Sequence, residues 1–243
     1  MNTTHQLQRY SVITEKNPRE IVLLRGRGCK WRRCRFCDYH LDADADEKNN
    51  FSLNEKVLAM VTGRYGKLEV INSGSFCDLD EGTMSLIKAL CQSKDIRQLH
   101  FECHWKDRGH ISALRSAFSS IGVAVKVKIG VETFDPLFRE SYLDKGIDES
   151  SPATIAEDFN ECCLLQGLPG QSEESMKKDI ETGLKYFERV CVNIMSKNSR
   201  PIQPDPEVIR RFQSRVLPIY RDNPRVDILM ENTDFGVGGE RHA

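Results

Sequence analysis

Residues 20–40 read EIVLLRGRGCKWRRCRFCDYH, and the rest of the chain is best understood outward from this stretch. Its first part, 20–25, is an apolar run that predicts a buried β-strand. Three cysteines follow within nine positions, Cys29, Cys34 and Cys37. Thiolates are the preferred protein ligands of zinc and of iron–sulfur clusters, so the loop after this strand is the candidate metal site.

Short apolar runs alternate with longer amphipathic stretches along the remaining chain. The predicted strands are 20–25, 68–72, 98–103, 124–131, 162–166, 190–195 and 226–230, and the predicted helices are 53–65, 80–93, 110–121, 136–145, 151–160, 172–187 and 206–220. This rhythm predicts an α/β fold of parallel strands, either an open doubly wound sheet or a barrel. In both, active sites lie where strands end, and the cysteine loop falls there.

The composition is that of an ordinary globular domain. Of 243 residues, 39% are hydrophobic and 29% charged, with a formal net charge of -1. This charge predicts no direct binding to nucleic acid, although a local basic face stays open. No apolar run of about 18 residues predicts a membrane span. The polar N-terminus has no secretory signal, so we expect a cytoplasmic protein.

We expect one domain over residues 1–243. Residues 1–19 are predicted to be an N-terminal extension, 38–50 a flexible acidic loop, and 221–243 a strand and tail that close the barrel. The remaining cysteines do not predict a disulfide framework, because the chain holds nine cysteines in all, an odd number with uneven spacing. Four of them lie in apolar runs and are predicted to be small core residues, namely Cys91, Cys162, Cys163 and Cys191.

Three interpretations of the cysteine loop stay open from spacing alone. A structural zinc would be held by the three cysteines and His40. A 2Fe–2S cluster of the plant ferredoxin type would need a distant fourth ligand, and Cys77 is available by count. A 4Fe–4S cluster with three protein ligands would keep one iron open, as catalytic metal sites require.

At this point the sequence resembles the radical S-adenosylmethionine (SAM) superfamily. Phe36 stands directly before Cys37, as an aromatic residue does in that family, although the family's Cys-x3-Cys spacing is one residue longer here. Residues 72–76 (NSGSF), 128–134 (KIGVETF) and 166–171 (QGLPGQ) are similar to the family's SAM-binding segments. The resemblance implies a partial TIM-like (βα)6 barrel, a 4Fe–4S cluster on Cys29, Cys34 and Cys37, and SAM contacts from Phe36, Ser73, Gly74, Ser75, Glu132, Gln166 and Gly167.

Most of the chain also resembles the bacterial queuine lyases of queuine salvage, through residues 28–40, 72–78 and 231–239. That resemblance implies a 5′-deoxyadenosyl radical that cleaves queuine to 7-aminomethyl-7-deazaguanine, with a flavodoxin or ferredoxin as electron donor. The alternatives are a radical SAM enzyme acting on another deazapurine or a tRNA base, and a zinc-stabilised nucleic-acid-binding module. Residues at predicted strand ends are the candidates for substrate contact: Glu102, His104, Lys128, Asn193, Glu231, Asn232 and Asp234.

Overall fold

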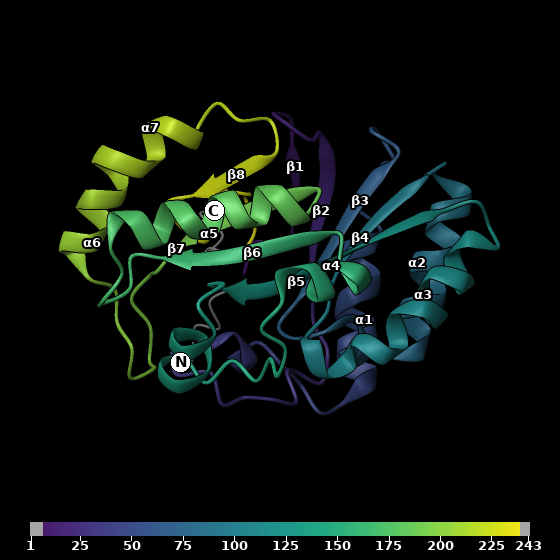
Figure 1. Cartoon of the computed structure of the whole chain (residues 1–243). Helices are drawn as coiled ribbons and strands as arrows, with labels where there is room; N and C mark the ends of the chain where they lie inside the picture. Colours follow the sequence, from purple (N-terminus) through teal and green to yellow (C-terminus); the bar gives the residue numbers. More distant parts are fainter. Residues whose placement is uncertain (1–6, 239–243) are drawn as a thin grey trace.

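The computed structural model describes residues 7–238, whose strands form one eight-stranded sheet in the order β1 to β8 (Figure 1). The strands are β1 (Tyr10–Ile13), β2 (Arg19–Leu24), β3 (Lys67–Asn72), β4 (Gln98–Glu102), β5 (Ala124–Glu132), β6 (Glu161–Gln166), β7 (Arg189–Ile194) and β8 (Val226–Leu229). β1 pairs antiparallel with β2, and all later neighbours pair in parallel. The predicted partial barrel of six βα units is confirmed.

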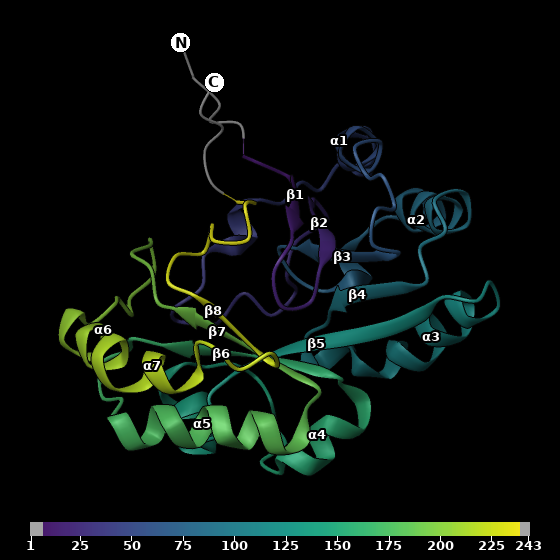
Figure 2. The same cartoon turned by 90° about the horizontal axis from the view of Figure 1, so that it is seen from above.

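The helices lie on the convex side of the curled sheet, as Figure 2 shows from above. They are α1 (Glu47–Leu58), α2 (Glu81–Ser93), α3 (Ile111–Ser119), α4 (Pro152–Asp158), α5 (Glu173–Tyr186), α6 (Pro206–Arg211) and α7 (Leu217–Tyr220). The core fills the space between helices and sheet. Phe101 of β4, for example, has its ring centroid 6.1 Å from that of Phe76 and 6.0 Å from that of Phe118 in α3. The concave face is thereby left for the functional site.

One predicted boundary at the N-terminal side was wrong, and the expected extension holds a strand. The extension 1–19 contains β1, a short strand whose residues are all only partly buried. The loop 38–50 is shorter than predicted, because α1 already begins at Glu47, where the Asp46 side chain accepts a hydrogen bond from the Lys48 N–H. A short 3-10 turn, Tyr39–Leu41, lies within the rest of that loop.

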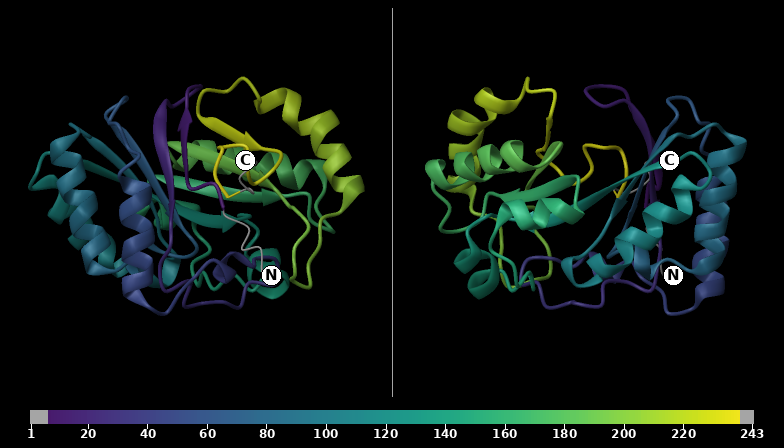
Figure 3. Two further views of the ribbon diagram at one scale, coloured as in Figure 1. Left: turned by 180° about the vertical axis from the view of Figure 1, so that it is seen from behind. Right: turned by 45° about the vertical axis from the view of Figure 1, so that its right-hand side comes forward.

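The segment after β8 crosses the open side of the half-barrel towards β1 (Figure 3). The N–H of Gly238 donates to the carbonyl oxygen of Gln8, just before β1, at 2.8 Å, and the Phe235 ring faces the guanidinium of Arg19 in β2 at 5.1 Å. The described part of the predicted closing tail therefore does contact the first strands, while residues 239–243 lie outside the described residues. Among residues 7–238, none of the helices has the length and apolar character needed to cross a membrane.

Candidate active site

A cavity opens on the concave face at the carboxyl ends of the strands. One part, of about 310 Å³, lies beside the cysteine loop, and a second part, of about 960 Å³, extends beneath the segment after β8. The two parts share lining residues from several strand ends, among them Asn72, Ser73, Glu102, Lys128 and Asn193. They therefore form one continuous site.

The three predicted ligand cysteines all line the smaller part of this cavity, together with Phe36. Their loop is tied by backbone contacts to segments that follow other strands. The Cys29 N–H donates to the Ser73 carbonyl at 3.1 Å, the Arg35 N–H donates to the Leu143 carbonyl at 3.0 Å, and Asn198 Nδ2 donates to the Phe36 carbonyl at 2.6 Å. Because three separate segments hold the loop, its thiols are positioned by the whole barrel rather than by the loop alone.

The donor set fits an iron–sulfur cluster better than a single zinc ion. In residues 7–238 no three side chains of the histidine, cysteine or carboxylate type gather around one point as a preformed metal site. A cubane does not need such a gathering, since each thiolate binds a different iron. Burial raises the pKa of Cys34 to about 12, against the opposing effect of the Lys145 ammonium. Binding of a cluster must therefore displace protons from the thiols.

A buried ion pair borders the cysteines. Lys145 Nζ donates to Glu132 Oε1 at 2.6 Å, with the two side chains 13% and 9% exposed. Glu132 ends β5 after a bulge and has a φ of 65°, a left-handed conformation that is costly for a residue with a Cβ. The bulge thus turns the Glu132 carboxylate towards Lys145 and the cavity, where both residues line the wall.

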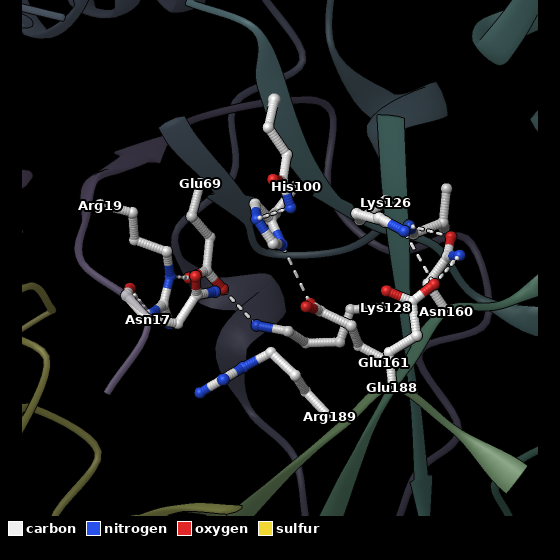
Figure 4. A network of polar contacts seen from close by, with 12 residues as sticks. Asn17, Arg19, Glu69, His100, Lys126, Lys128, Asn160, Glu161, Glu188 and Arg189 are labelled. Carbon is white, nitrogen blue, oxygen red and sulfur yellow. Dashed lines mark hydrogen bonds and ion pairs between the residues drawn. The ribbon is translucent and has the colours of Figure 1, made fainter. Parts of the chain in front are cut away.

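Charged residues form the floor of the cavity (Figure 4). Lys128 Nζ donates to Glu69 Oε1, and Arg19 Nε donates to the other carboxylate oxygen of Glu69 at 2.5 Å. These two cations hold the pKa of Glu69 well below its usual range despite burial. Glu102 lines both parts of the cavity, and its carboxyl group has no hydrogen bond or ion pair among residues 7–238. Burial raises the pKa of its carboxyl to about 7, while Lys128 opposes that rise.

The structure brings most of the predicted site residues to the cavity and leaves four outside its lining. Those that line it are Cys29, Cys34, Phe36, Cys37, Ser73, Gly74, Glu102, His104, Lys128, Glu132, Asn193, Glu231 and Asn232. Ser75, Gln166, Gly167 and Asp234 do not. Gln166 Nε2 donates to the Met176 carbonyl at 2.9 Å, and Asp234 Oδ2 accepts the Glu231 N–H at 3.0 Å. These contacts give both side chains a role in shaping the backbone around the site.

Two cysteines predicted for the core face the cavity instead. Cys91 and Cys162 do lie in the core, but Cys163 and Cys191 line the cavity wall and are direct partners across β6 and β7. An apolar run in a parallel strand is buried on both faces, so its sequence does not reveal which residues point inward. Lys145 also lines the cavity and was missed because it lies in a loop with no motif around it. Tyr39 lines it too; it stands within the 28–40 stretch, but it is neither a thiol nor directly beside a cysteine, so the motif did not mark it.

Comparison with known proteins assigns the family. No protein-family model and no curated protein matches the chain. A solved structure of a queuine lyase from Clostridium spiroforme, bound to SAM and queuine, is 43% identical and superposes with a TM-score of 0.92, covering 96% of this chain and 100% of that one. Two structures of Streptococcus suis SuiB, one of them bound to S-adenosylmethionine, share the fold at 12% identity with TM-scores of 0.56 and 0.57. Each match covers 88% of this chain and about half of the SuiB chain, 50% and 51%. The chain therefore belongs to the queuine lyase family of radical SAM enzymes.

Proposed function

We propose that this protein is a radical SAM lyase that cleaves queuine to 7-aminomethyl-7-deazaguanine. The observation that carries the proposal is the 43% identity, over 96% of the chain, to a queuine lyase bound to SAM and queuine. The cavity supports it, because three thiols and several polar strand-end side chains converge there. A zinc-stabilised nucleic-acid-binding module does not account for that similarity.

In this proposal Cys29, Cys34 and Cys37 would hold a 4Fe–4S cluster, and residues of the neighbouring strand ends would hold SAM. When bound, these two cofactors supply the 5′-deoxyadenosyl radical that activates the substrate. Ser73 and Gly74 stand beside Cys29, at the end of β3, where their backbone can meet the amino-acid end of SAM. Ser75, Gln166 and Gly167 would act behind them, by holding the turns that shape this pocket.

The substrate would occupy the wider part of the cavity. The guanine-like edge of a deazaguanine presents two adjacent N–H donors, which a carboxylate accepts together. Glu102 is suited to this task because its carboxyl lines the cavity without a hydrogen-bond partner in residues 7–238. Asn193, Glu231 and Asn232 line the same part of the cavity and are available to the diol of queuine.

His104 and Lys128 would act at the borders of the substrate site, Lys128 through its contact with Glu69 and His104 through its neutral ring. His104 Nε2 lies 3.0 Å from the Lys145 carbonyl, and the ring stacks with Trp31 at a centroid distance of 6.0 Å. Burial, reinforced by the Lys145 charge, lowers the His104 pKa to about 4, so this ring is neutral at pH 7. It would therefore shape the cavity without adding charge.

The proposal also includes a flavodoxin or ferredoxin as electron donor and a cytoplasmic location.

Anaerobic turnover tests the proposal. Reconstituted protein is incubated with SAM, a reductant and queuine, and the products are identified by mass spectrometry, with Cys34→Ala protein as the control. We expect 5′-deoxyadenosine and 7-aminomethyl-7-deazaguanine from the wild type and neither from the variant. Release of 5′-deoxyadenosine without loss of queuine would reject the lyase activity, and assays with other deazapurines or tRNA would then identify the base that reacts.

A further inference from the structure

Two carboxylates, Glu102 and Glu69, can compete for the ammonium group of Lys128, and in the structure Lys128 pairs with Glu69. Glu102 and Lys128 are direct partners on the neighbouring parallel strands β4 and β5, so their side chains leave the sheet side by side. Side chains at such positions are close enough to form a cross-strand ion pair. Lys128 nevertheless donates to Glu69, which belongs to β3 and pairs in register with His100 rather than with Lys128.

The competing carboxylate, Glu69, is held in place more firmly than Glu102. Its side chain is 2% exposed, and it also accepts from Arg19, itself 2% exposed. Arg19 is fixed in turn by the Asn17 carbonyl at 2.8 Å and by Asp227 at 3.9 Å. Figure 4 shows Glu69 between the two cations, with the Lys128 amine pointing towards it. The Lys128 ammonium thus has a rigid acceptor on β3, because the Glu69 carboxylate also accepts a hydrogen bond from Arg19.

We propose that Glu69 is a positioning residue of the substrate site, which holds Lys128 against β3 and thereby keeps the Glu102 carboxyl available to the heterocycle. This inference rests on the proposed queuine site but goes beyond it, because Glu69 need not touch the substrate to act. Lys128 has two carboxylates as register partners, Glu102 on β4 and Glu161 on β6, and Glu161 already pairs with His100 at 3.1 Å. If Glu69 lost its charge, Lys128 would therefore turn to Glu102. The Glu102 carboxyl would then be occupied before the substrate arrived.

Several other charged groups face Glu102 and must be separated from this effect. Lys128 and Lys145 favour its ionised form, whereas Glu69 and Glu132 disfavour it. Removing the Glu69 charge would therefore ease ionisation of Glu102 slightly even if Lys128 did not move. The Lys128→Met background separates the two effects, because only the direct influence of Glu69 on Glu102 remains there.

The first measurement follows the Glu102 carboxyl without any ligand. Infrared spectra are recorded against pH for the anaerobic cluster-loaded protein, and the Glu102 band is assigned as the one absent from Glu102→Gln. In the wild type we expect its midpoint near 7. In Glu69→Gln we expect the midpoint to fall by about one pH unit or more, as for a carboxyl that gains a cation partner. In Lys128→Met it should rise, and adding Glu69→Gln to that variant should change it little.

The second measurement is queuine affinity at pH 8 with SAM present and no reductant, so that nothing turns over. Glu69→Gln should bind queuine about tenfold more weakly, as expected when a charge-assisted hydrogen bond to the ligand has a competitor. Glu20→Gln is the matched control: it removes a buried carboxylate of β2, 0% exposed, which is not among the residues lining the cavity and accepts from the Thr62 and Gly63 N–H groups, both at 2.7 Å. It should keep both the affinity and the Glu102 midpoint of the wild type.

The results separate the inference from the proposed function. An unchanged Glu102 midpoint in Glu69→Gln overturns the positioning role, as does an equal fall in the Lys128→Met background. If Glu69→Gln does not fold, the Lys128→Met midpoint decides, and a value at or below that of the wild type rejects the role. If the midpoints behave as expected but wild-type protein does not bind queuine, the positioning of Glu102 stands and the proposed substrate is wrong.

Discussion

Replacing Gly74 with alanine should loosen the cysteine loop. A Cβ on this residue would lie 2.3 Å from Asp78 Oδ2 and 2.9 Å from the backbone nitrogen of Cys29. Asp78 cannot give way easily, because it is 2% exposed and its Oδ2 accepts the Ser75 N–H at 2.8 Å. The strain should therefore fall on the other neighbour, the backbone of Cys29.

The size of the effect follows from two opposing contributions. Overpacking a well-ordered site costs about 1–3 kcal/mol. Restricting the unfolded chain by a glycine-to-alanine change returns about 0.4–1 kcal/mol. The net loss is about 1–2 kcal/mol, which lowers the melting temperature of a domain of this size by roughly 2–8 °C. Because Cys29 moves, we also expect less iron per protein after anaerobic reconstitution.

Gly109→Ala is the matched control for this prediction. A Cβ at Gly109 meets no heavy atom within 4 Å, so this variant should bind iron normally and be unchanged or slightly more stable. Thermal unfolding and iron analysis of both variants give the comparison. If Gly74→Ala protein melted with the wild type and carried the same iron, the close approach of the 72–76 segment to the cysteine loop would not be what positions Cys29.

Three further predictions concern the thiols, the substrate carboxyl and the pH dependence of stability. Cys34→Ala should abolish visible cluster absorbance and turnover, whereas Cys91→Ala, in the core, should keep both; iron retained by the first variant would reject the ligand assignment. Glu102→Gln should weaken queuine binding about tenfold or more in titration calorimetry while SAM binding stays normal, and equal loss of both would indicate general damage. Burial raises the pKa of Asp179 in the folded protein to about 6. Between about pH 4 and 6 the folded protein therefore binds more protons at this residue than the unfolded chain does. The free energy of unfolding falls as the pH rises through that window. Urea unfolding of Asp179→Asn should accordingly show a smaller loss of stability from pH 4 to pH 7 than the wild type, and parallel curves would refute this.

The sequence predicted the repeating architecture well because each βα unit carries its own periodic signal. It failed where a tertiary contact replaced that signal. The first turns of α1 are polar, and two of their asparagines, Asn50 and Asn54, are buried against Arg25, where Asn54 Oδ1 accepts the Arg25 N–H at 2.8 Å and Asn50 Oδ1 accepts from Arg25 Nε at 2.8 Å. Periodicity counts such residues as exposed, so the helix was predicted to begin at residue 53 instead of Glu47.

The cysteine motif of the site could be predicted from the sequence, but the charged residues that pair around the site could not. Cys29, Cys34 and Cys37 stand out by composition, and they do line one cavity. Lys145 and Glu69 carry no local signature, because their importance arises from partners that are far away in the chain, Glu132 and Lys128. A charged residue inside a predicted strand is the one available hint, since a parallel strand is normally apolar on both faces.

The charged residues on the concave floor show why a charge inside a parallel strand is informative. Burying an isolated charge costs several kcal/mol, and only a well-paired partner offsets the cost. The floor meets this condition with a network of pairs: Glu69 binds Arg19 and Lys128, Asp227 binds Arg189 and lies 3.9 Å from Arg19, and Glu161 pairs with His100. Next to the cysteines, Lys145 takes up Glu132 in the same way. With these cations engaged, Glu102 is left as a cavity carboxyl without a partner in residues 7–238. A group in that position gains most from a ligand that brings its own N–H donors, which is the property that the guanine-like edge of queuine supplies.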